Sequence, residues 1–457
     1  MRKIIRLLFV LYSSVLFAQT NSGYMSNSFI LDSRINPASM PGKTTIIGLP
    51  FLSNFSLAGQ VPYSLDDVFR TREDDSLLVS IPQILENSHN KNSLYLSLRE
   101  QVFYVGTTIG FDKKTFIYIG DEFVTNGGFS FSKDFLAYFL EGNGNFLNKK
   151  LDFETEGFGF TSYNSLYIGL SHQIDKQWKA GMRFNYLNGI LNLHTERFNI
   201  SFHTDSTSRP TYVTDVSADI LIQSSGLRLL TDGSNGFDFM ELDIMGNRGF
   251  SIDMGVEYQY DDKLRFSASV TDLGSISWSE INSKHYQTNG NVAYTFSGLD
   301  YDDEGENDFQ DQINEMTDSL KIVFEIDTLL GSYSTSLPAN IYLGGEYSIS
   351  KKQSVSLLYQ HSKILRKRYG ALSLGYQHQL TNSFRGMVNY HIINSSFDNL
   401  GLGFVWSPRK FQLYLLVDNV FAWNLQRTES LYFKMGMSIQ IRKKEQATPF
   451  TEGKMLY

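Results

Sequence analysis

An acidic run in the second half of the chain has the spacing of a calcium-binding loop. Carboxylates occupy its first, third, fifth and twelfth positions and glycine its sixth, the order in which such a loop places ligands around Ca²⁺. The residue types depart from that pattern, because the fifth is Glu, the twelfth is Asp, and a strand pattern precedes the run. The alternative is a solvated acidic outer loop. The carboxylates are Asp300, Asp302, Glu304 and Asp311.

A second set of charged residues alternates with apolar residues along the chain. Successive side chains of a strand point to opposite faces, so these residues fall on the polar faces of predicted strands. They either line a polar path or form neutralising pairs that fill and stiffen an interior. The set consists of Arg183, Asp253, Glu257, Arg265, Glu346, Arg385 and Lys434.

Motifs for catalysis are missing from the sequence. It contains no GxSxG, HExxH or phosphate-cradling glycine loop, and it has 0 cysteines. The histidines do not assemble a site, since His361 and His378 lie on apolar faces and His391 on a polar one. We therefore expect no enzyme and no cofactor. A lipase with Ser and His on the outside of a barrel is the one enzyme class left open.

The clearest structural element is the stretch 250–279, which shows two strands and the turn between them. Apolar and polar residues alternate strictly on both sides of Asp261-Asp262. If Gln259 pairs with Lys263, Glu257 stands opposite Arg265 and like faces meet. Such a sheet is either half of a soluble sandwich or the wall of a membrane barrel.

Connections of two alternating classes favour the barrel. Short turns rich in Asp, Lys and Ser alternate with long polar excursions, the asymmetry of periplasmic turns and outer loops. This rule predicts an antiparallel all-β barrel of fourteen strands, with both termini in the periplasm. The predicted strands are 44–58, 94–111, 115–124, 164–174, 178–194, 248–260, 263–279, 339–350, 353–365, 370–380, 385–394, 399–407, 410–420 and 430–442.

Composition agrees with this class. Of 457 residues, 14% are aromatic, which suits the girdles of a membrane barrel, while the mean hydropathy of −0.22 excludes a helical membrane protein. The 40 basic and 48 acidic residues leave no basic footprint, so nucleic acid is not an expected partner. A barrel closed by hydrogen bonds also needs no disulfides.

The N-terminus has the features of a secretory signal. Three basic residues precede an apolar run from Leu7 to Phe17, which is shorter than the ~20 residues of a spanning helix. With cleavage after Ala18, we expect a signal peptide at 1–18, an N-terminal segment without strand pattern at 19–43, the barrel at 44–442 and a periplasmic tail at 443–457.

Several local features lie outside this regular pattern. Pro50 predicts an irregular first strand. The outer excursions predict a short helix with Phe135, Leu136, Phe139 and Leu140 on one side, a projecting hairpin at 198–203 and 212–222, and a helix at 308–320. Outer loops this long are usually functional or disordered.

Three motifs carry a family resemblance. Asn36-Pro37-Ala38, the run 270–274 with Trp278, and the run 337–344 together resemble a family of exported Bacteroidota proteins of unknown function. That family is similar to the long-chain fatty acid transporter (FadL-like) barrels of the outer membrane. The resemblance implies fourteen strands and an N-terminal plug that includes Asn36, Pro37 and Ala38. It also implies an inward strand kink, for which Gly127-Gly128 is the candidate.

The predicted function follows from barrel and resemblance together. We expect an outer-membrane protein that contacts lipid and passes or holds a small hydrophobic molecule. No set of basic residues for a fatty-acid carboxylate matches the transporters. A related branch of these barrels serves secretion, so the alternative is a structural or secretion-accessory barrel that binds an envelope protein through its outer loops.

Overall fold

The computed structural model describes most of the chain after residue 28. The described residues are 24, 29–41, 44–71, 77–154, 156–206, 214–226, 246–288, 290–294, 327–364, 367–393, 396–420 and 430–442. The predicted signal peptide, the acidic run 300–311, the predicted helix 308–320 and the tail 443–457 lie outside them. Within these ranges, no helix has both the length and the apolar character needed to cross a bilayer.

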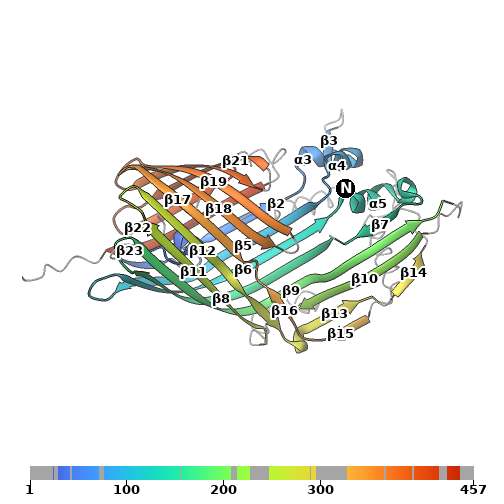
Figure 1. Cartoon of the computed structure of the whole chain (residues 1–457), viewed down its shortest axis with the longest axis horizontal. Coiled ribbons are helices and arrows are strands. Elements are labelled where there is room, and N and C mark those ends of the chain that lie inside the picture. The colour runs from blue at the N-terminus through green and yellow to red at the C-terminus, as the bar shows by residue number, and fades with distance from the viewer. Residues whose placement is uncertain are drawn as a thin grey trace, which may run out of the picture.

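The predicted antiparallel barrel of fourteen strands is confirmed (Figure 1). Its first strand is in two parts, and the barrel closes where β1 pairs with both β5 and β23. The wall consists of β1 (Thr44–Gly48) with β2 (Phe55–Gln60), β5 (Asn92–Ile109), β6 (Thr115–Phe131), β8 (Gly157–Gln173), β9 (Trp178–Thr204), β11 (Arg248–Gln259), β12 (Leu264–Trp278), β17 (Asn340–Ser350), β18 (Gln353–Ile364), β19 (Lys367–Gln379), β20 (Phe384–Ile393), β21 (Ser396–Trp406), β22 (Phe411–Val417) and β23 (Ser430–Arg442).

The side chains of β11 show which way the sheet faces. Phe250 and Met254 point outward and are 53% and 47% exposed, whereas Ser251 and Asp253 are 2% and 0% exposed. Apolar residues outside and polar residues inside are the inverse of a soluble sandwich. The observed arrangement is therefore that of an outer-membrane-type barrel, and the sandwich alternative is wrong.

The register of the β11–β12 hairpin differs from the prediction by two residues. Gln259 pairs with Arg265, and Glu257 with Ser267. The turn is longer than expected because the Asp261 carboxylate accepts two backbone N–H groups, at 2.8 and 2.7 Å. A shift of two keeps every side chain on its predicted face. Arg265 still reaches Glu257 diagonally, at 3.5 Å.

The first strand is irregular, as Pro50 predicts. Residues 49–54 bulge between β1 and β2, with Phe51 at φ 57°. The bulge stays attached to both neighbours, since the Phe51 N–H donates to the Val102 carbonyl at 3.2 Å. From β22, on the far side of the neighbouring strand β23, the Tyr414 hydroxyl donates to Asn54 Oδ1 at 3.0 Å.

The kink expected at Gly127-Gly128 is not there. Gly127 pairs with Leu96 and Phe160, and Gly128 with Tyr95, with no shift of register at these positions. A glycine permits a break but does not cause one when both neighbouring strands supply partners. For the same reason β6 runs on to Phe131, where the sequence predicted an end at 124.

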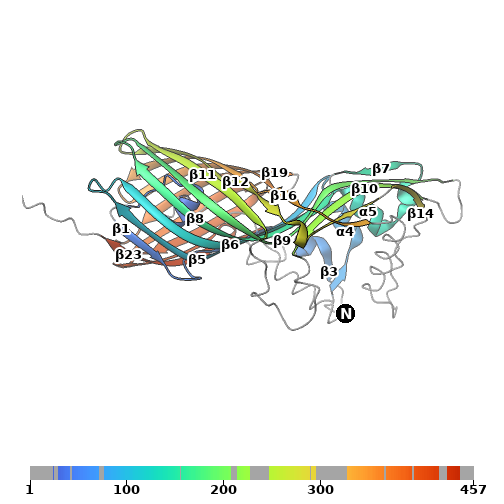
Figure 2. The same ribbon diagram turned by 90° about the horizontal axis from the view of Figure 1, so that it is seen from below.

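Beyond the long-loop end of the barrel, the sheet of the wall extends into a projecting region, which we call the head (Figures 1 and 2). The outer part of β9 pairs with β7 (Lys150–Phe153) and β10 (Thr214–Ser225), which confirms the predicted hairpin. Its other elements are β13 (Ser283–Gln287), β14 (Gly290–Tyr294), β15 (Asp327–Leu330), α3 (Leu65–Val68), β3 (Phe69–Thr71), β4 (Leu77–Val79), α4 (Ile81–Asn87), α5 (Lys133–Glu141), η2 (Asn143–Phe146) and η3 (Glu280–Asn282), while β16 (Tyr333–Ser336) pairs with the outer end of β12.

The head has its own apolar core between its helices and one face of its sheet. Tyr138 of α5, Phe153 of β7 and Phe202 of β9 are buried together. The predicted short helix is confirmed, and its Phe135, Leu136 and Phe139 pack on this core. Burial raises the pKa of the Tyr138 hydroxyl, which accordingly stays neutral.

Candidate ligand site in the lumen

The N-terminal segment crosses the inner wall in the short-turn half of the barrel. It contains α2 (Phe29–Ile35) and the Asn-Pro-Ala sequence that follows. The Ser269 hydroxyl of β12 donates to the Ile35 carbonyl at 2.5 Å, and the Ser171 hydroxyl of β8 donates to the Ala38 carbonyl at 2.9 Å. Consecutive residues of the segment thus lie over consecutive strands.

Two glycines hold the middle of this crossing. Gly255 and Gly181 are register partners on β11 and β9. A Cβ on Gly255 would overlap the Asn36 side chain, and one on Gly181 would overlap the Pro37 carbonyl. Asn36 Nδ2 also donates to the Val256 carbonyl at 3.0 Å. The row of small residues Ser171, Gly181, Gly255 and Ser269 therefore lets the segment lie against bare backbone.

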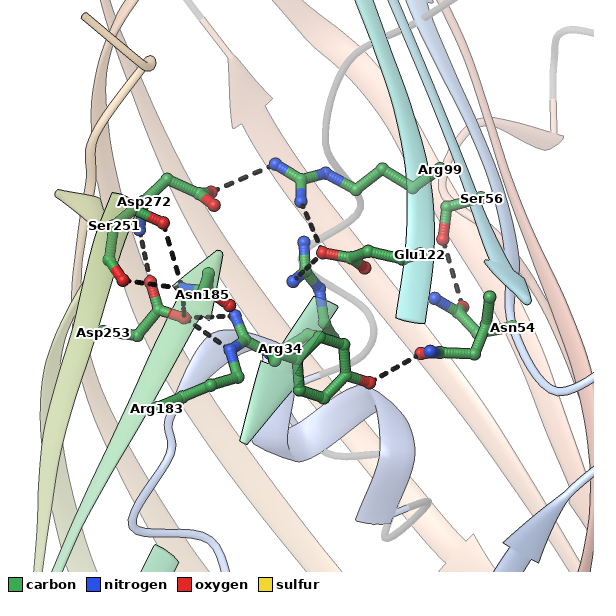
Figure 3. Close-up of polar contacts among 12 residues, drawn as sticks. Arg34, Asn54, Ser56, Arg99, Glu122, Arg183, Asn185, Ser251, Asp253 and Asp272 are labelled. Atoms are coloured by element: carbon green, nitrogen blue, oxygen red, sulfur yellow. Dashed lines mark hydrogen bonds and ion pairs between the residues drawn. The ribbon is translucent and has the colours of Figure 1, made fainter. Parts of the chain in front are cut away.

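Arg34 joins the same segment to a buried cluster of charges (Figure 3). Its Nη1 lies 2.5 Å from Oε1 of Glu122 on β6. The same oxygen lies 3.5 Å from Arg99 of β5, and Arg99 lies 3.0 Å from Asp272 of β12. Glu122 is 2% exposed. Two guanidinium groups thus share one buried carboxylate, and removing it would leave both without that partner.

A second buried pair adjoins the first. Arg183 of β9 lies 2.5 Å from Asp253 of β11, and Asn185 donates to the same carboxylate at 3.2 Å. The other oxygen of Asp253 accepts the Asp272 N–H at 2.5 Å. Arg34, Arg99 and Arg183 therefore face Glu122, Asp253 and Asp272 in a cluster of balanced charge, which we call the ionic layer.

A β-bulge places Asp272 in this layer. The β11–β12 register shifts between Ile252 and Met254, and Asp272 has φ 58°. Such a left-handed residue re-aims its side chain and leaves its N–H free for a side-chain partner. Here the N–H binds Asp253 and the carboxylate binds Arg99, so the 270–274 motif has a structural role.

The other predicted lumen residues lie nearer the short turns or on the opposite wall. Glu257 lies 3.0 Å from Lys179, and Arg265 pairs with Glu346. Arg385 is half-buried on β20. Lys434 borders a void of about 50 Å³ beside Arg99 and Asp272. Sequence reasoning missed Arg34, Arg99, Glu122 and Asp272, although Glu122 alternates with apolar residues in a predicted strand. No group of three or more potential metal ligands occurs among the described residues.

An apolar layer covers the ionic layer on its long-loop side. Along β6, the inward residue after Glu122 is Val124, which is 0% exposed. Its buried partners, which include aromatics from β8 and β12, come from four further parts of the chain. They are Tyr163, Leu187, Ile276, Trp278 and Leu337.

Above this layer the lumen opens into a cavity of about 680 Å³, which we call the outer cavity. That size is in the range of small-molecule sites. Its wall mixes aromatic and aliphatic side chains, glycines, and hydroxyl and amide groups. The lining residues are Tyr95, Asn126, Gly127, Ser130, Gly157, Phe158, Gly159, Thr161, Tyr163, Asn192, His194, Thr195, Glu196, Ser334, Thr335, Ser336, Leu337, Pro338 and Ala339.

Comparison with known proteins gives a family. A family model described as "Family of unknown function (DUF5723)" matches residues 37–418. The chain belongs to this family. The expected membership in a family of unknown function is therefore confirmed. A search of curated proteins finds no match.

A search of solved structures finds distant similarity to transporter and translocator barrels. The toluene transporter TodX of Pseudomonas putida is 10% identical with a TM-score of 0.41, over 93% of this chain and 94% of that one. A FadL homologue of Pseudomonas aeruginosa is 9% identical with a TM-score of 0.40, over 93% and 98%. The translocator domain of the autotransporter NalP of Neisseria meningitidis is 8% identical with a TM-score of 0.32, over 94% and 99%.

Proposed function

We propose that this DUF5723 protein is an outer-membrane barrel that holds a small, largely hydrophobic molecule in its outer half and passes it inward when the N-terminal segment moves. The observation that carries the proposal is the outer cavity of about 680 Å³ inside the wall. The exposed apolar faces of the strands would contact membrane lipid. We assign no catalytic step to the protein.

The layers below the cavity support a gated path rather than an open channel. A molecule in the cavity meets first the apolar layer around Val124, then the ionic layer, then the segment at Asn36. The void beside Lys434 and Arg99 has a volume of only about 50 Å³. Inward passage therefore needs a displacement of the segment, which acts as a plug in this proposal.

The test is to identify what the exported barrel carries. We expect native mass spectrometry of the detergent-purified protein to show a stoichiometric small molecule, which extraction then identifies. Gly157→Leu should reduce its occupancy, because a side chain there enters the cavity with its Cβ no closer than 3.5 Å to Thr195. Gly144→Leu, where a Cβ meets nothing within 4 Å, is the matched control. An empty barrel, or equal occupancy in both variants, would refute the proposal.

A second candidate function is a secretion-accessory or structural role through the head. It is favoured by a separate feature, the apolar core around Tyr138. This core stabilises the part of the sheet that extends beyond the length needed to cross a membrane. The exposed face of that sheet carries the Arg197–Asp219 pair, at 3.1 Å. A photo-crosslinker in place of Arg197 should then capture one envelope protein in intact cells, with stoichiometric yield. No capture at this position would remove the candidate.

A further inference from the structure

We propose that the outer cavity selects a neutral molecule that carries a hydrogen-bond acceptor, such as a carbonyl or ester oxygen, and discriminates against carboxylates. This inference rests on the proposed function and names the class of ligand. It goes beyond a preference for hydrophobic molecules in two ways. It assigns a hydrogen bond with the ligand to one residue, and it states that the wall of the cavity disfavours negatively charged ligands.

Asn126 supplies the polar contact. It lies on β6 and lines the cavity, yet it is only 8% exposed. Its Oδ1 accepts the Tyr95 hydroxyl at 3.2 Å, whereas its Nδ2 has no hydrogen-bond partner among the residues that the structure describes. A buried amide donor without an acceptor costs free energy, which an acceptor on a bound molecule would recover. The donor is therefore suited to an oxygen of the ligand.

The charges that line the cavity favour a neutral acceptor over a carboxylate. The described residues that line the cavity include no lysine or arginine, and the one lining histidine, His194, lies 3.3 Å from the Glu196 carboxylate of the same wall. The nearest layer of cations lies beneath Val124 and Leu187, and there Arg99 already faces Glu122 and Asp272. A carboxylate in the cavity would be desolvated without an opposite charge, which is unfavourable. A neutral acceptor avoids that cost.

The remaining wall accepts the apolar part of such a molecule. Phe158, Tyr163, Leu337 and Pro338 line the same cavity. Flat aromatic faces and aliphatic groups bury a ring or a short chain without a directional requirement. A single buried donor surrounded by apolar side chains would orient the ligand, because this donor binds only the end of the ligand that carries the acceptor.

Three probes of nearly equal shape test the selectivity. They are 2-acetylnaphthalene, with a neutral acceptor, 2-ethylnaphthalene, without one, and 2-naphthoate, with a negative charge. Binding is measured by saturation-transfer NMR on the barrel in nanodiscs, with empty nanodiscs subtracted. We expect the ketone to bind about five-fold more tightly than the hydrocarbon, as one hydrogen bond would give. The carboxylate should bind at least ten-fold more weakly than the ketone.

A pair of variants isolates the Asn126 donor. Tyr95→Phe removes the hydroxyl that occupies Oδ1 but leaves Nδ2 in place, so the ketone should keep its preference. In the Tyr95→Phe/Asn126→Leu double variant, no orphaned hydroxyl remains and the preference should disappear, with hydrocarbon binding unchanged. Heat-modifiable migration on gels checks that both variants fold.

The outcomes separate this inference from the proposed function. If ketone and hydrocarbon bind equally and Gly157→Leu weakens both, the cavity is a binding site but water satisfies Asn126, and the inference is wrong. Tightest binding of naphthoate would overturn it as well. If every probe binds wild type and Gly157→Leu equally well, or none binds at all, the outer cavity is not a binding site and the proposed function itself fails.

Discussion

The two halves of the lumen differ in what fills them. In the short-turn half, small residues such as Gly181 and Gly255 admit the N-terminal segment, and buried charges pair across it. In the long-loop half, a cavity of about 680 Å³ is lined by hydroxyl, amide and aromatic groups. One wall of continuous strands thus carries a packed interior at one end and a ligand-sized space at the other, because side-chain volume and charge change along each strand.

The largest effect should come from breaking a charge pair in the packed half. Arg183→Ala leaves the Asp253 carboxylate, 0% exposed, without its cation, so we expect a loss of about 3–5 kcal/mol in unfolding free energy. Urea titration followed by heat-modifiable gel migration measures it. Lys150→Ala, which breaks an exposed pair with Asp152, is the control and should leave the transition unchanged. Equal midpoints for the two variants would contradict a packed, charge-paired half.

Filling the row of small residues should convert the packed half into an open one. Gly255→Val places a side chain where Asn36 lies, so the segment can no longer seat on β11. We expect an increase in single-channel conductance in planar bilayers and new proteolytic cleavage within residues 29–41. Gly345→Val is the matched control, because a Cβ there meets only Phe266, at 3.8 Å. A closed barrel with a protected segment would show that the row does not seat the segment.

A smaller effect should follow from loosening the contact between segment and wall. Glu122→Gln keeps the shape but removes the charge that Arg34 and Arg99 share, at a cost of about 1.5–3 kcal/mol for the charge-assisted bond. Hydrogen exchange of the amides of residues 29–41 should then speed up by about ten-fold to one hundred-fold. Glu196→Gln, in the outer cavity, should leave that exchange unchanged. Identical protection in wild type and Glu122→Gln would remove Arg34 as the anchor.

Strand number and direction were predictable because period-two alternation runs through most of each wall strand and is broken only locally, as at the Asp272 bulge. The faces of Phe250 and Asp253 follow from that alternation alone, even where the register was wrong by two residues. Register itself depends on how the turn is closed, and the Asp261 carboxylate does so in a way that alternation does not reveal.

The site was less accessible to sequence reasoning, since it joins distant segments. Arg99 meets Asp272 from 173 positions away, and the meeting depends on a bulge with φ 58° that no residue type announces. The Asn36-Pro37-Ala38 motif was visible, but its small partners Ser171 and Gly181 belong to ordinary alternating strands. The outer cavity depends on how β6, β8 and β9 continue past membrane length, and the sequence prediction made each of these strands too short at its outer end.

The length of β9 has a mechanical consequence. This strand spans 27 residues, from the turn at Trp178 to Thr204 in the head, about 90 Å at 3.3 Å per residue, with register shifts at Ile190 and Glu196. A membrane crossing uses only about 9–11 of them. Asn192 and Glu196, which line the outer cavity, lie between the two parts. The strand thus joins the head to the wall of the cavity through one continuous backbone, and its two bulges, at Ile190 and Glu196, are the points at which a force on the head would bend it.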